Sequence, residues 1–97
     1  MTIHNIRVLF VDDEPNVLAA LKRMLRTKRN EWTMEFTDSG LAALALLEGS
    51  RFDIVVSDIK MPGMDGAELL NKVKDKYPGI IRMALSGQVG LNEVIKV

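Results

Sequence analysis

Three aspartates, Asp12, Asp13 and Asp58, are the residues of this sequence whose type and spacing could support chemistry. Asp12 and Asp13 follow the hydrophobic run at residues 8–11, and Asp58 follows a second, largely hydrophobic run at residues 54–57. Runs of this kind are typical of strands that are buried on both faces of a parallel sheet. The strands of such a sheet end at one edge, where ligands bind. We therefore expect the three carboxylates to lie close together.

Carboxylates that meet without a partner repel one another, and at least one of them tends to stay protonated. A hard divalent cation such as Mg²⁺ removes the repulsion, because it prefers oxygen ligands and needs few of them from the protein. The chain has no cysteine, and its single histidine, His4, lies in the N-terminal tail, where we do not expect a ligand. An acidic pair alone is more often an ordinary helix start. The third aspartate is what favours a magnesium site.

The elements that must position these residues alternate between strand and helix. Strands are expected at residues 7–12, 32–37, 52–57 and 80–85. Helices are expected at residues 15–29, 40–49, 65–77 and 89–97, from apolar spacing and, for the second and third, from the capping residues Ser39 and Asp65. Strands that alternate with helices over short loops predict a parallel α/β sheet with right-handed crossovers. We expect a flavodoxin-like, doubly wound parallel sheet with strand order 2-1-3-4.

Length and composition narrow the possible functions. The 97 residues are enough for one small domain, with 13 basic and 13 acidic residues and no net charge, so bulk electrostatics do not draw it to nucleic acid. The longest apolar run, residues 41–47, is too short to span a bilayer, and the N-terminus lacks a signal-peptide pattern. We expect a cytoplasmic domain that binds neither nucleic acid nor membrane.

Three segments together carry a family resemblance. They are VDDEP at residues 11–15, SDIKMPGMDG at residues 57–66 and ALSG at residues 84–87. Each lies at the C-terminal end of an expected strand, in an order that resembles the receiver domain of bacterial response regulators in two-component systems. The resemblance covers residues 1–97 and implies a phosphoacceptor domain, with no enzymatic activity beyond self-catalysed phosphotransfer and dephosphorylation.

The resemblance also implies a role for each matching residue. Asp58 would be the phosphoacceptor, attacking the phosphohistidine of a sensor histidine kinase or phosphotransfer protein. Asp13 and Asp58, with the backbone carbonyl of Lys60 and with Asp12 either directly or through water, would hold Mg²⁺. Ser86 would donate a hydrogen bond to a phosphate oxygen and act as a switch.

The same resemblance implies roles for two further residues, Gly87 and Gln88, and a second role for Lys60. Gly87 would leave room for the phosphate, while Lys60 and Gln88 would tune the rate at which water removes it.

The resemblance has one clear departure at the C-terminus. The family continues with a fifth strand, which carries a phosphate-contacting lysine, and a fifth helix, so we expect this receiver domain to be incomplete and to lack both. Lys96 precedes any such strand and is not assigned the lysine's role. Losing one donor to a developing anion typically costs about 10²–10³ in rate. We therefore expect a low yield of phosphorylation.

A shortened sheet predicts self-association. The strand at residues 80–85 would be left with an unpaired edge, and the expected short helix would expose Leu91, Val94 and Ile95. We expect a dimer or larger assembly through residues 80–85 or the C-terminal segment. The alternative function is accordingly a shortened receiver that acts as a phosphorylation-independent interaction or oligomerisation module.

Two other functions are weaker interpretations. A phosphohydrolase with an aspartyl nucleophile needs a second aspartate two residues later, where this chain has Lys60. A dinucleotide-binding fold needs a Gly-x-Gly-x-x-Gly segment after the first strand, which is absent. The basic residues of the first helix form a solvated face or, alternatively, a surface for docking a kinase or another partner; they are Lys22, Arg23, Arg26 and Arg29.

Overall fold

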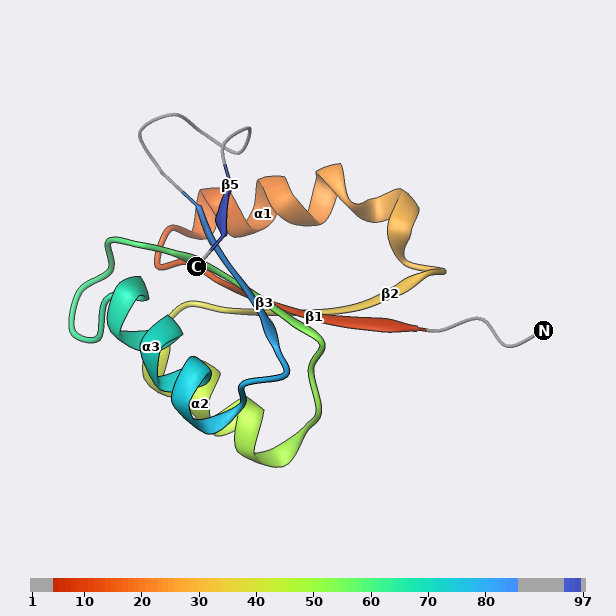
Figure 1. Ribbon diagram of the computed structural model, residues 1–97. Coiled ribbons are helices and arrows are strands. Elements are labelled where there is room, and N and C mark those ends of the chain that lie inside the picture. The colour runs from red at the N-terminus through yellow and green to blue at the C-terminus, as the bar shows by residue number, and fades with distance from the viewer. Residues whose placement is uncertain (1–4, 86–93, 97) are drawn as a thin grey trace.

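The computed structural model describes residues 5–85 and 94–96 (Figure 1). Its strands are β1 (Ile6–Val11), β2 (Trp32–Thr37), β3 (Ile54–Asp58), β4 (Ile81–Leu85) and β5 (Val94–Lys96). Its helices are α1 (Pro15–Met24), the short 3₁₀ helix η1 (Arg26–Lys28), α2 (Gly40–Gly49) and α3 (Gly66–Lys76). Strand and helix therefore alternate as far as β4, as the sequence predicts.

The sheet has the order β2-β1-β3-β4-β5, and its first four members pair in parallel. The predicted flavodoxin-like arrangement with order 2-1-3-4 is confirmed. The β1–β3 register pairs Val11 with Ser57. Asp12 and Asp58, the next residue on each strand, therefore emerge side by side at the C-terminal edge of the sheet.

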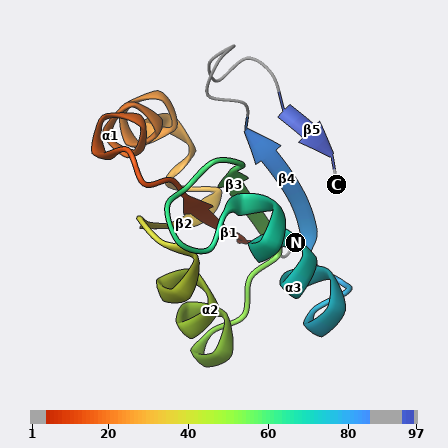
Figure 2. The same cartoon turned by 90° about the vertical axis from the view of Figure 1, so that its left-hand side faces the viewer.

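Helices cover both faces of the sheet, with α1 on one face and α2 and α3 on the other (Figure 2). Successive side chains of a strand point to opposite faces. Leu9 and Val11 therefore join the apolar cluster beneath α2 and α3, whereas Val8 and Phe10 join the cluster beneath α1. Burial on both faces explains why β1 is a continuous hydrophobic run rather than an alternating one.

The first helix is shorter than predicted. It ends at Met24 and gives way to the 3₁₀ turn η1, although the sequence pattern predicts helix as far as Arg29. Such a tighter turn is common at helix C-termini, and the β-branched Thr27 has a weaker helix propensity. None of the helices in residues 5–85 is long and apolar enough to cross a bilayer.

The C-terminal segment corrects a prediction. Residues 94–96 form β5, which pairs antiparallel with β4 from Met83↔Lys96 to Leu85↔Val94, instead of belonging to a helix over residues 89–97. Residues 89–93 and 97 lie outside the described residues. Isolated helices this short are marginal, whereas the edge of β4 offers main-chain hydrogen bonds. The edge that was expected to be open is therefore covered over residues 83–85.

Candidate functional site

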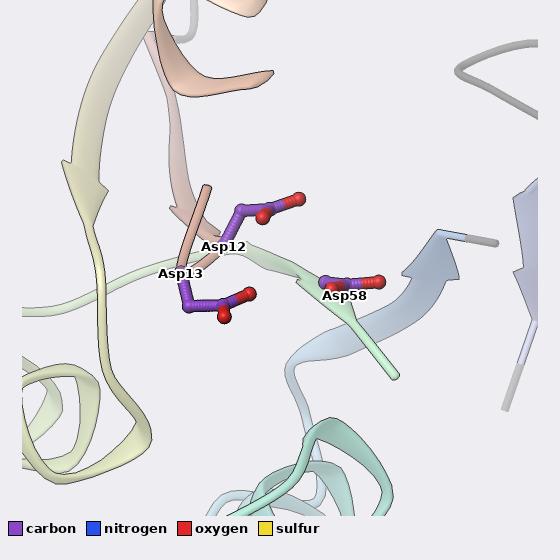
Figure 3. Close-up of side chains that lie close together, drawn as sticks. All are labelled: Asp12, Asp13 and Asp58. Atoms are coloured by element: carbon purple, nitrogen blue, oxygen red, sulfur yellow. The ribbon is translucent and has the colours of Figure 1, made fainter. Parts of the chain in front are cut away.

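The three aspartates predicted to converge do so at the C-terminal edge of the sheet (Figure 3). Asp12 and Asp13 directly follow β1, and Asp58 is the last residue of β3. One carboxylate oxygen from each residue lies within 4.8 Å of the others. Asp12 is only 4% exposed, whereas Asp13 and Asp58 are half-buried. The parallel register of β1 and β3 is what brings together residues 46 positions apart, Asp12 and Asp58.

Burial dominates the electrostatics of Asp12. It raises the pKa of this carboxyl above the ordinary value of 3.8, because a charged oxygen is poorly solvated there. A hydrogen bond from the backbone N–H of Glu14 to Asp12 Oδ1, at 2.9 Å, acts in the opposite direction. The negative charge of Asp58 raises the pKa of Asp12 further.

Asp58 is shifted in the same direction. Burial raises its pKa most, and the negative charge of Asp13 adds to the shift. The backbone N–H groups of Ile59 and Lys60 partly compensate by favouring the charged form. Burial and mutual repulsion therefore both destabilise the ionised form of the cluster. A bound divalent cation would offset both effects, and three converging carboxylates fit the oxygen preference of a hard cation such as Mg²⁺.

The loop after β3 folds back tightly onto the end of that strand. Gly66, the first residue of α3, donates its N–H to the carbonyl oxygen of Ile59 at 2.7 Å. A Cβ atom at Gly66 would lie 1.7 Å from the carbonyl oxygen of Asp58, so only glycine permits this approach. Ser57 Oγ donates to the same carbonyl oxygen at 2.9 Å. These contacts hold the backbone that carries Asp58.

Two of these structural roles were not predicted from the sequence. The Ser57 hydrogen bond and the Gly66 contact both converge on the Asp58 carbonyl. A glycine at the first position of a helix, where it has poor propensity, was a usable signal of close backbone approach. Ser57 offered no comparable signal, because a serine at a strand end is ordinary.

The remaining predicted site residues fall into two groups. Lys60 lies in the loop directly after Asp58, and its side chain is exposed. Ser86, Gly87 and Gln88 lie outside the described residues. The β3–β4 register pairs Asp58 with Leu85, so β4 ends beside the carboxylate cluster.

The fold and site together define a class: a doubly wound α/β domain with three converging aspartates at the C-terminal edge of its sheet. The family model for the response regulator receiver domain matches residues 8–97. The chain belongs to this family of two-component signalling domains.

Curated relatives are consistent with this assignment. The chain is 39% identical over 90 residues to the two-component response regulator ORR26 of Oryza sativa subsp. japonica, covering 88% of this chain and 15% of the relative. It is 45% identical over 73 residues to the heme response regulator HssR of Staphylococcus aureus strain MRSA252, covering 74% of this chain and 31% of the relative. The chain therefore spans less than a third of the length of either protein.

Solved structures share the fold. The signal receiver domain of an HD domain-containing protein from Pseudomonas fluorescens Pf-5 aligns with a TM-score of 0.82 and 31% identity, covering 91% of this chain and 69% of that one. Response regulator protein TrrA from Thermotoga maritima, in complex with Mg²⁺ and BeF, aligns with a TM-score of 0.75 and 31% identity, covering 84% of this chain and 69% of that one. A structure of histidine kinase ThkA in complex with response regulator protein TrrA aligns with a TM-score of 0.76 and 28% identity, covering 91% of this chain and 74% of that one.

Proposed function

We propose that this receiver domain accepts a phosphoryl group on Asp58 from a phosphohistidine, with Mg²⁺ held by Asp12, Asp13 and Asp58. The observation that carries the proposal is the convergence of the three carboxylates within 4.8 Å. Burial separates their roles. Asp12 is nearly inaccessible and accepts the Glu14 N–H, which suits an orienting metal ligand, whereas Asp58 is half-buried and therefore more exposed for reaction.

The proposed step is a transfer onto the chain's own residue. An ionised oxygen of Asp58 attacks phosphorus, the new O–P bond forms as the N–P bond of phosphohistidine breaks, and the leaving imidazole nitrogen takes up a proton. The product is an acyl phosphate on Asp58. Bound Mg²⁺ would supply neutralisation of the negative charge on the transferring oxygens. The domain would thus be a phosphoacceptor rather than an enzyme that turns over a separate substrate.

Two of the similar structures support the chemistry and the partner. One is a receiver in complex with Mg²⁺ and BeF, which is consistent with an oxygen-ligated magnesium site in this family. The other is a histidine kinase in complex with a response regulator, which supports a sensor kinase or a phosphotransfer protein as the phosphodonor for Asp58. The proposal also includes three minor roles. Ser86 would contact the phosphate, Gly87 would leave space for it, and Lys60 and Gln88 would tune the rate at which water removes it.

The test is phosphorylation in solution. Incubation with acetyl phosphate and Mg²⁺ should increase the intact mass of the wild type by one phosphoryl group, and peptide mapping should place that group on Asp58. Asp58→Asn should remain unmodified. Asp75→Asn, which changes an exposed carboxylate on α3, is the matched control and should be modified as the wild type is.

Metal binding is tested separately. Mg²⁺ titration should shift the amide resonances of Asp13 and Ile59, and Asp13→Asn should weaken the affinity. A folded protein that binds Mg²⁺ but takes no phosphate from acetyl phosphate or a kinase would contradict the phosphoacceptor role. That result would favour the phosphorylation-independent interaction module instead.

A further inference from the structure

β2 is an edge strand, and in the described sheet it pairs only with β1. At its two ends, the carbonyl of Glu31 accepts from the N–H of Ile6 at 3.2 Å, and the carbonyl of Thr37 accepts from the N–H of Asp12 at 3.1 Å. Main-chain groups alternate in direction along a strand. The main-chain N–H and C=O groups of the odd-numbered residues of β2 therefore point to β1. Those of the even-numbered residues, Trp32, Met34 and Phe36, point to the free edge.

The side chains of these three edge residues face α1 and line a groove. The groove lies between α1 and the sheet edge, and its residues are Lys22, Arg29, Trp32, Thr33, Met34 and Phe36. Phe36 is anchored by stacking on Phe10, with ring centroids 5.0 Å apart. Lys22 Nζ lies 5.2 Å from the centroid of the Phe36 ring. Apolar rings thus form the floor of the groove, and cationic groups lie beside it.

The helical side of this groove carries charge of one sign, whereas the acidic residues Glu31 and Glu35 belong to the β2 side. Residues 15–30 contain no acidic residue. They contain five basic residues, which are Lys22, Arg23, Arg26, Lys28 and Arg29. The chain as a whole is neutral, so this segment is a local excess. Within residues 5–85, the one ion pair joins Lys76 to Glu48 on the opposite face of the sheet, which leaves all five cations available.

We propose that this groove binds an acidic, extended segment of a protein partner, which adds to the sheet as a strand beside β2. The outward N–H and C=O groups of Trp32, Met34 and Phe36 would pair with the main chain of the segment. Alternate side chains of an added strand point to the α1 face. Acidic residues at every second position would therefore meet Lys22 and Arg29.

Charge and geometry disfavour the other occupants. A second copy paired symmetrically through β2 would bring two basic segments onto the same sheet face, where they repel. Nucleic acid lacks the alternating donors and acceptors that a sheet edge recognises, and a neutral chain attracts it weakly. The site is distinct from the carboxylate cluster, so its test does not depend on phosphorylation.

Trp32 is the only tryptophan of the chain and reports directly on the groove. A capped peptide of alternating glutamate and valine should change its fluorescence saturably, and added salt should weaken the binding. Lys22→Glu with Arg29→Glu should lower the affinity about tenfold. Lys72→Glu with Lys74→Glu, an equal change of charge on exposed residues of α3, should leave it unchanged. A lysine–valine peptide should not bind.

Amide exchange tests the added strand. On peptide binding, the N–H groups of Trp32, Met34 and Phe36 should gain protection, while those of Thr33 and Glu35, already paired with β1, should not. Met34→Pro removes one outward donor without breaking the β1–β2 ladder and should weaken peptide binding. Met34→Ala is the control for the lost side chain and should bind more tightly than Met34→Pro.

Any of three kinds of result would overturn the proposal. The first is a failed binding test, which means either no saturable change in Trp32 emission or an equal loss of affinity in the α3 control variant. The second is competition by a single-stranded oligonucleotide that Met34→Pro does not affect, which would make the groove an electrostatic nucleic-acid surface. The third is a concentration-dependent dimer that Met34→Pro abolishes, which would make a second copy the occupant.

Discussion

Asp58 carries a charge that the metal-free fold disfavours. Its pKa is raised in the folded protein. At pH values between the ordinary pKa of 3.8 and the raised pKa, the native state therefore binds more protons than the unfolded chain. Stability contributed by this residue is therefore greatest below 3.8 and falls as the pH rises through that window. Asp58→Asn should unfold at a higher temperature than the wild type at pH 7 in the presence of a chelator, and the difference should disappear near pH 3.

Millimolar Mg²⁺ provides the control for this prediction. It should raise the melting temperature of the wild type more than that of Asp58→Asn, because the cation offsets the repulsion in the native state. Asp75→Asn, on α3, should respond to Mg²⁺ as the wild type does. A stabilising effect of Asp58→Asn that persists unchanged at pH 3 would show that the substitution acts through packing rather than through charge.

Among the glycines of the described residues, Gly66 is the one at which an added Cβ atom meets backbone atoms most closely. A Cβ atom there would meet the carbonyl oxygen and carbon of Asp58, and neither can rotate away as a side chain could. Gly66→Ala should lower the free energy of unfolding by about 1–3 kcal/mol or more, as measured in urea, and should shift the amide resonances of residues 57–60.

Gly49→Ala is the matched control for the same glycine-to-alanine change. A Cβ at Gly49 meets nothing within 4 Å, and the backbone there has no positive φ. Stability should rise by about 0.4–1 kcal/mol or stay the same. Equal effects at the two positions would mean that the loop after β3 relaxes freely, and that Gly66 does not position Asp58.

At the scale of elements, α2 begins at Gly40 as the sequence predicts, and α3 begins at Gly66, one residue later than predicted, because Asp65 is its N-cap. Ser39 accepts from the N–H of Ala42 at 3.1 Å, and Asp65 accepts from the N–H of Glu68 at 2.8 Å. The cap of α3 matters beyond stability, because Gly66 and the loop that carries Asp58 adjoin it.

Removing the α3 cap should loosen that helix start. Asp65→Ala should lower the free energy of unfolding by about 0.5–2 kcal/mol, because the N–H of Glu68 loses its acceptor. Asp65→Asn keeps a side-chain oxygen and should recover most of the loss. Equal destabilisation by the two variants in urea would assign the effect to the charge of Asp65 rather than to the hydrogen bond.

At the scale of the whole molecule, self-association through the strand at residues 80–85 stays a prediction. β5 pairs with residues 83–85 of β4, but Ile81 lies outside that pairing and is 45% exposed. An uncovered apolar strand edge is a template for another chain. Light scattering over the micromolar range should show a mass that rises with concentration.

A charge at that position should oppose the association. Ile81→Lys should keep the chain monomeric, because a lysine on an edge strand disfavours pairing with another edge. Leu41→Lys, at an apolar residue of α2 that is 71% exposed, should associate as the wild type does. A wild type that stays monomeric at every concentration would show that the described edge is adequately protected.

The sequence by itself determined the strand order, the two helix caps and the convergence of Asp12, Asp13 and Asp58. Hydrophobic runs, capping residues and strand-end acids are local signals, and parallel topology places every strand end at one edge. The pattern therefore specified the position of the site without any knowledge of distances. The roles assigned to Ser86, Gly87 and Gln88 came from motif order alone and remain predictions.

Only the tertiary structure decided the features that depend on distant partners. Residues 94–96 have apolar spacing compatible with a short helix, but pairing with β4 makes them a strand. The close approach of Gly66 to Asp58, and the burial that distinguishes Asp12 from Asp58, likewise exist only after β1, β3 and α3 have packed. Edge pairing, desolvation and backbone contact are set by neighbours in space, and no periodicity along the chain encodes them.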